Sequence, residues 1–148
     1  MKKKGMAMVL CLVLLAAMAP ARVYGAEAEP LQAMRTSEYI RDYNVYISRA
    51  DSGTVRIAFS VYATMRMDDV GATRIYIYGG PSEDQMVLKH TFYESTSPTM
   101  IASDAMSHSS SVTYTGQAGY YYKALVYVRA TKDGVWDSRN TWTSTVKV

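Results

Sequence analysis

The sequence lacks the residues on which many small extracellular proteins depend. It has one cysteine, Cys11, which lies inside an early apolar segment, and only two histidines, His90 and His108. A disulfide framework needs paired cysteines, and a zinc site needs several cysteine or histidine ligands. The longest apolar run, residues 6–19, is shorter than the roughly 20 residues that cross a bilayer as a helix. We therefore expect no disulfide, metal site, cofactor or membrane span.

Positive charge is also scarce once the first residues are set aside. The whole chain has a net charge of +3, but from Glu27 onward it carries twelve basic and thirteen acidic side chains. A nucleic-acid-binding protein needs a clustered cationic footprint. The sequence therefore predicts a protein that does not bind nucleic acid.

Residues 1–28 have the layout of a secretory signal peptide. Three lysines at residues 2–4 precede the apolar run, and small residues follow it, an order typical of such leaders. Cleavage before Ala26 or before Glu29 fits the small-residue rule, so we expect it between Gly25 and Glu29. The alternative is an uncleaved anchor. We expect a secreted, freely released extracellular domain at residues 29–148, with no membrane contact after the leader is removed.

Apolar and polar residues alternate with a period of two through most of the remaining chain, which predicts β-strands. Turn signals, among them the Asp-Ser-Gly at residues 51–53 and the Asp-Gly at residues 133–134, separate the strands. Residues 68–71 are predicted to break the pattern, and residues 94–107 to form a surface connection with a brief strand at residues 100–102. Seven strands are predicted at residues 43–48, 55–62, 73–78, 85–92, 108–114, 120–130 and 136–148.

Short strands at this spacing favour a single all-β domain, an antiparallel β-sandwich, with a barrel as the alternative. A glycine-containing corner at residues 116–119 leads into Tyr120 and Tyr122. This arrangement resembles the tyrosine corner of fibronectin-like and immunoglobulin-like sandwiches; which tyrosine makes the corner hydrogen bond is left open here.

The layout also resembles an uncharacterised group of short secreted proteins of Gram-positive bacteria. The resemblance rests on the lysine-rich leader and on the C-terminal motifs, which are Gly-Tyr-Tyr-Tyr-Lys at residues 119–123, Val-Tyr-Val at residues 126–128, Asp-Gly at residues 133–134 and the Thr- and Ser-rich residues 141–148. It implies a secreted sandwich and carries over no activity and no site.

Catalytic signals are weak. Asp104 and His108 are four residues apart, a spacing that brings side chains together only on a helix. No Gly-x-Ser-x-Gly segment is present to expose a nucleophilic serine. The acidic pairs at residues 68–69 and 83–84 lie beside predicted turns, where acidic residues commonly form local hydrogen bonds. We therefore predict that the protein is not an enzyme, and a hydrolase is the less favoured alternative.

The most informative feature is one predicted sheet face. In the strand at residues 120–130, the inward set is predicted to be Tyr120, Tyr122, Ala124, Val126 and Val128, which turns the odd-numbered residues outward. For the last strand, Trp136, Trp142, Val146 and Val148 are predicted to face inward, with Asp137, Arg139, Thr141, Thr143, Thr145 and Lys147 outward. In a fibronectin-like order these two strands and the one at residues 73–78 are neighbours.

Their outward side chains form a surface rich in tyrosine and arginine, residue types that are enriched at binding hot spots. The predicted ligand-binding residues are Tyr76, Tyr78, Tyr121, Tyr127 and Arg129. The predicted function is a non-catalytic binding or cell-surface interaction module for a glycan, a cell-wall polymer or an extracellular protein. Two alternatives stay open: the tyrosines are ordinary sheet surface, or the protein is a structural subunit that assembles through its sheet edges.

Overall fold

The computed structural model describes residues 38–148; the predicted leader and its cleavage sites lie outside this range. No helix within it is long and apolar enough to cross a membrane. Short 3-10 turns, η1 (Glu83–Gln85) and η2 (Pro98–Met100), accompany seven strands. The strands are β1 (Ile40–Asp51), β2 (Thr54–Gly80), β3 (Val87–Tyr93), β4 (Ile101–Thr115), β5 (Tyr121–Lys132), β6 (Val135–Trp142) and β7 (Val146–Lys147).

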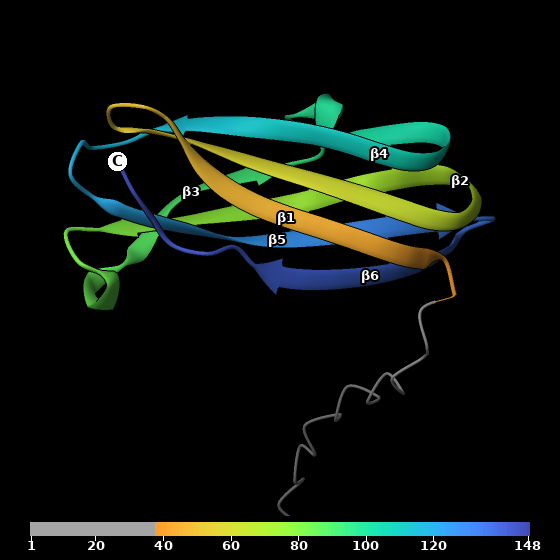
Figure 1. The fold of residues 1–148 in the computed structure, drawn as a ribbon. Helices are drawn as coiled ribbons and strands as arrows, with labels where there is room; N and C mark the ends of the chain where they lie inside the picture. Colours follow the sequence, from red (N-terminus) through yellow and green to blue (C-terminus); the bar gives the residue numbers. More distant parts are fainter. Residues whose placement is uncertain (1–37) are drawn as a thin grey trace, which may run out of the picture. The chain divides into compact units, whose positions relative to one another are not determined.

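The strands form two layers, and every pairing is antiparallel, which confirms the predicted all-β sandwich (Figure 1). One layer consists of β1, the first half of β2, and β4. The other consists of β3, the second half of β2, β5 and β6, with β7 beside the start of β5. As the fibronectin-like order predicts, the strand at residues 73–78, now the second half of β2, lies beside β5, and β5 lies beside β6.

The predicted break at residues 68–71 is wrong, because β2 runs unbroken from one layer into the other and curves at the end where it is labelled in Figure 1. Asp69 pairs with both β4 and β5, so the ladder is continuous at the crossing. Gly71 makes the crossing possible. It has a φ of +151°, and a Cβ there would lie 2.1 Å from the carbonyl oxygen of Met100.

The predicted surface connection at residues 94–107 is wrong in its second half. β4 begins at Ile101, and its first residues pair with β2, as in Ala105 opposite Met67. The polar composition concealed this strand because β4 lies at the edge of its layer, where serine and threonine side chains meet solvent.

The predicted inward set of β5 is confirmed: Tyr122, Ala124, Val126 and Val128 are buried, and Tyr120 packs against the core. Their partners across the core come from β1 and the first half of β2, and include Phe59 and Ile57. Burying this apolar surface is the main source of stability in a described domain that contains no cysteine.

The tyrosine corner belongs to Tyr122. Its phenol oxygen accepts a hydrogen bond from the backbone N–H of Gln117 at 2.8 Å, which ties the β4–β5 connection to the core. Two glycines leave room for the ring. A Cβ at Gly79 would lie 2.3 Å from the Tyr122 ring, and one at Gly116 would lie 2.1 Å from its hydroxyl oxygen.

Both predicted hairpin turns are confirmed. Gly53 has a φ of +74° between β1 and β2. Asp133 and Gly134 have φ values of +49° and +77° between β5 and β6. Consecutive positive φ values suit the twist of a two-residue hairpin, and glycine adopts them at little cost.

The predicted facing of the last strand is wrong for its first half. Trp136 and Trp142 pair with Thr131 and Leu125 on the outer side and are 54% and 47% exposed, whereas Thr143 is buried. The strand ends at Trp142, and an extra residue before β7 inverts the alternation, so Val148 is buried as predicted.

Asp137 and Arg139 were also predicted to face outward, and they lie on the inner side of β6. They form an ion pair at 3.1 Å. Asp137 also accepts hydrogen bonds from the backbone N–H groups of Tyr39 and Ile40. Polar residues are tolerated on the inner side of β6 because this side faces the beginning of β1. The backbone N–H groups there need hydrogen-bond acceptors.

Candidate functional site

The outer surface of the second layer carries the predicted ligand-binding residues. Strand register places the side chains of Tyr76, Tyr78, Tyr121, Tyr127 and Arg129 on this one surface, and all five are partly buried. We call it the aromatic face and define it by these five residues together with Arg74, Tyr93, Lys123, Leu125, Trp142 and Lys147.

The aromatic rings of this face contact one another across neighbouring strands. Tyr76 of β2 meets Tyr127 of β5 edge-to-face, with ring centroids 5.8 Å apart. Tyr78 of β2 and Trp142 of β6 lie 5.3 Å apart at a tilt of 54°. Such pairs stabilise a sheet surface, and they also hold the rings in fixed positions.

Basic side chains lie over these rings. The Arg74 guanidinium is 5.7 Å from the ring centre of Tyr76 and 5.5 Å from that of Tyr93. It also donates a hydrogen bond to the Tyr76 hydroxyl at 2.8 Å, and this contact raises the pKa of Arg74. Lys123 lies 4.8 Å from the Trp142 ring centre and Lys147 lies 5.1 Å from that of Tyr121.

Arg129 differs from the other predicted residues because its guanidinium already forms an ion pair with an acid. Its Nη2 donates to both carboxylate oxygens of Glu94, at 3.2 and 3.0 Å. Both side chains are about one-third exposed, and the Arg129 Nε is buried without a hydrogen-bond partner. Arg129 therefore anchors the segment after β3 and is not a free cation.

Two residues of the aromatic face were missed by the sequence reasoning. Trp142 was assigned to the inner side because the extra residue before β7 gives no sequence signal. Tyr93 ends β3, and its place beside Arg74 depends on a register shift between Ile77 and Tyr78. Lys123 and Lys147 were placed outward from alternation alone, as observed.

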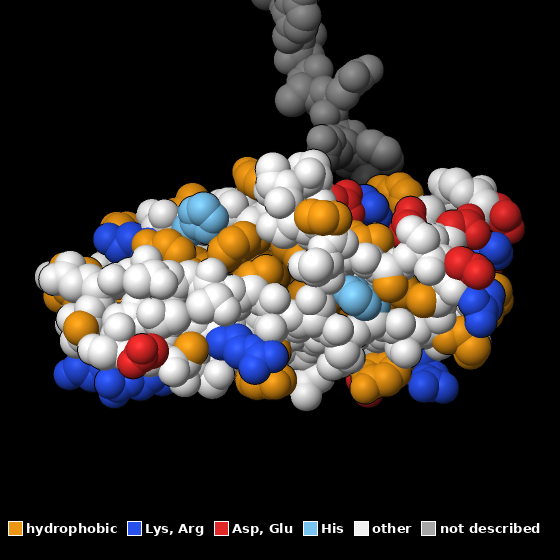
Figure 2. Space-filling model, turned by 90° about the horizontal axis from the view of Figure 1, so that it is seen from above, with side chains coloured by type: hydrophobic (Ala, Val, Ile, Leu, Met, Phe, Trp, Pro, Cys, Tyr) orange, Lys and Arg blue, Asp and Glu red, His pale blue; other side chains and the backbone are white. Residues whose placement is uncertain are grey.

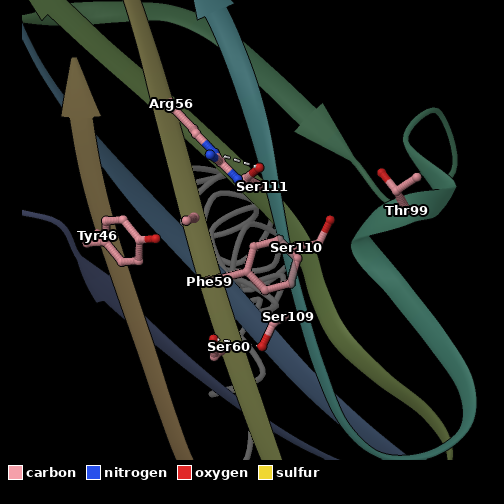
Figure 3. A pocket seen from close by; sticks show the side chains of 9 residues that line it. Tyr46, Arg56, Phe59, Ser60, Thr99, Ser109, Ser110 and Ser111 are labelled. Atoms are coloured by element: carbon pink, nitrogen blue, oxygen red, sulfur yellow. Dashed lines mark hydrogen bonds between the residues drawn. The ribbon is translucent and has the colours of Figure 1, made fainter. Parts of the chain in front are cut away.

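The first layer has a shallow hollow of about 410 Å³ (Figure 3). Its lining comes from β1, β2, β4 and η2, and its polar contacts are Arg56 Nε donating to Ser111 at 2.9 Å and Ser109 donating to Ser60 at 2.8 Å. The lining holds no carboxylate and no histidine. His108 lies nearby, and its Nε2 contacts the carbonyl oxygen of Thr99 at 2.7 Å rather than a serine hydroxyl.

Three of the acidic residues considered for catalysis, Asp68, Asp69 and Asp104, form local contacts. Asp68 bonds to Lys132 Nζ at 2.8 Å and to the backbone N–H of Asp133, and these contacts lower the pKa of Asp68. Asp69 accepts a hydrogen bond from Ser103. Asp104 pairs with Arg66 and not with His108. Within residues 38–148 no cluster of three potential metal ligands occurs.

No protein-family model matches this chain, and no curated protein matches it either. A proposed function therefore rests on the geometry of the described residues.

Proposed function

We propose that this protein is a secreted, non-catalytic binding module that holds a glycan or cell-wall polymer on the aromatic face. An extracellular protein is the other class of partner. The observation that carries the proposal is the convergence of six aromatic side chains, from β2, β3, β5 and β6, on one outer surface: Tyr76, Tyr78, Tyr93, Tyr121, Tyr127 and Trp142.

The composition of this surface suits binding. Tyrosine and tryptophan provide large contact area with few rotatable bonds, and they dominate binding hot spots. Ring pairs such as Tyr76–Tyr127 restrict the side chains before a ligand arrives, which lowers the entropy lost on binding. Tyr93 and Trp142 are 44% and 47% exposed, so their rings are accessible to a sugar.

The proposal is tested by retention of the purified protein on insoluble cell wall, mucin and a panel of immobilised polysaccharides. The double variant Tyr76→Ala with Tyr78→Ala should weaken binding to the retained material by about 1–3 kcal/mol, roughly five- to 150-fold. Tyr46→Ala is the matched control, because Tyr46 is 53% exposed on β1 in the other layer. Unchanged affinity in a folded double variant would rule out this surface.

A second candidate function is self-assembly through β4. Among the described strands, this 15-residue strand pairs with β2 alone, and residues 107–115 contain no proline, lysine, arginine or acid. Figure 2 looks down on this side, where most side chains are uncharged, acidic ones gather mainly toward one end and basic ones are scattered. Natural proteins protect such edges with charges, prolines or bulges.

Gel filtration at increasing concentration tests this second candidate. Edge pairing predicts an oligomer that forms as the concentration rises. The Ser109→Lys variant should stay monomeric, because a lysine on the edge strand opposes close approach of a second copy. A monomer at every concentration would exclude it.

A further inference from the structure

Charge is distributed unevenly over the described domain. Residues 38–148 carry eleven acidic and eleven basic side chains. The aromatic face nevertheless contains four cations, which are Arg74, Lys123, Arg129 and Lys147. Of these, Arg129 alone forms an ion pair with a described acid, Glu94. The face is thus positive on a domain of zero net charge.

Three of these cations remain available to a ligand. Glu94 occupies Arg129, whereas Arg74, Lys123 and Lys147 form no ion pair with any described residue. Each lies instead within about 6 Å of a ring centre of the same face. A cation beside an aromatic ring creates a site with two kinds of contact. The ring suits C–H groups of a ligand, and the cation suits a negatively charged group.

We infer that the ligand of the aromatic face is an acidic polysaccharide, whose sugar rings bear carboxylate or sulfate groups. This inference rests on the proposed function. A sugar of this class places its C–H surface on Trp142 or Tyr121 and its acidic substituent against Lys123 or Lys147. A neutral glycan would leave the cations unused, and a polyanion without rings would leave the aromatic side chains unused.

A nucleic acid also combines rings with negative charge, but the charge count favours the polysaccharide. Nucleic-acid binding draws a large share of its affinity from contacts between cations and many phosphates, and this face offers three free cations. Single-stranded DNA is therefore a competing ligand for the test to exclude.

The experiment compares acidic polysaccharides with their uncharged counterparts. Polygalacturonate and hyaluronan are each measured beside their methyl esters, and dextran sulfate is measured beside dextran, at low salt and at about 0.15 M salt. We expect at least one acidic form to bind tenfold or more tightly than its neutral partner, and the added salt to weaken that binding. The combined variant Arg74→Gln, Lys123→Gln and Lys147→Gln should lose the preference, whereas Arg56→Gln in the other layer should keep it.

The contrary outcomes separate this inference from the proposed function. Equal binding of esters and acids through the tyrosines, or binding of neutral glycans only, would contradict the inference of an acidic ligand. Either result would still agree with the proposal of a binding module. Equal binding of polyphosphate or oligothymidylate would also overturn it, since charge or a nucleic acid would then suffice. Binding to none of the polysaccharides or cell-wall material would overturn the acidic ligand and the glycan proposal together.

Discussion

The Tyr122 hydroxyl accepts a hydrogen bond at 2.8 Å from the backbone N–H of Gln117, five residues earlier in the chain. The Tyr122 ring is 1% exposed, so this one side chain contributes both to the core and to the β4–β5 connection. The residues of β5 that follow Tyr122 form much of the aromatic face. The position of β5 therefore depends on this hydrogen bond.

We therefore predict that Tyr122→Phe destabilises the protein by about 1–3 kcal/mol, because the partly buried Gln117 N–H loses its acceptor. Urea denaturation measures the free energy of unfolding. Tyr121→Phe is the control, since Tyr121 points outward and keeps its ring contact with Lys147; it should change stability by less than about 0.5 kcal/mol. Equal effects of the two variants would contradict this role for Tyr122.

Gly79→Ala and Gly116→Ala should each destabilise the protein, because the new methyl groups would overlap the Tyr122 side chain. Overpacking a well-packed core costs about 1–3 kcal/mol. Gly134→Ala provides the comparison, since a Cβ there meets nothing within 4 Å and only its φ of +77° opposes the change. Thermal unfolding should rank Gly134→Ala, at about 1 kcal/mol, as the mildest of the three, and the reverse ranking would contradict the packing argument.

Glu94→Gln should strengthen binding to an acidic polysaccharide. The substitution removes the carboxylate bonded to Arg129 and so adds a fourth available cation to the aromatic face. We expect a severalfold gain in affinity with a steeper dependence on salt, and a loss of about 1 kcal/mol or less in stability. Isothermal titration with the polysaccharide that the protein retains would measure the gain; an unchanged or weaker affinity would contradict it.

The Asp68–Lys132 ion pair predicts a pH dependence of stability. Contacts with Lys132 and with the Asp133 N–H lower the pKa of Asp68 in the folded state. Its contribution is therefore fully present above the unfolded pKa of about 4 and is lost as the pH falls through the lower folded value. Asp68→Asn should give a flatter stability profile below pH 4 than the unchanged protein. Parallel profiles in acid denaturation would show that Asp68 contributes nothing.

At the opposite end of the pH scale, the same contact raises the pKa of Lys132. Its contribution is present below the unfolded pKa and is lost as the pH rises through the folded one. Lys132→Met should therefore reduce the loss of stability that the protein shows above about pH 10. An identical alkaline profile in the variant would count against the pair.

The inner face of the sandwich could be predicted from the sequence because burial imposes a strict period of two. The predicted inward positions of β5, which are Tyr122, Ala124, Val126 and Val128, are all buried. Alternation fails where a strand changes direction without leaving the extended conformation. Residues 68–71 suggested a turn, and the structure places there a crossing that Gly71 makes possible.

The aromatic face could be predicted in part. Its tyrosines follow from alternation on β2 and β5. The outward position of Trp142 could not be predicted, because it depends on one extra residue between Thr143 and Val146, and the sequence there has no glycine or proline to mark it. The Glu94–Arg129 pair could not be predicted either. It joins residues 35 positions apart, and it depends on how the end of β3 lies against β2.

The two tryptophans allow a direct test of the central claim, that the aromatic face is the binding surface. Trp142 contacts Tyr78 and Lys123 within the face, and Trp136 lies on the same strand near the β5–β6 turn. A nitrogen-15 NMR titration with a retained polysaccharide would follow their two indole N–H signals. The account predicts a saturable shift of the Trp142 signal while the Trp136 signal stays in place. Binding that leaves the Trp142 signal unmoved would contradict it.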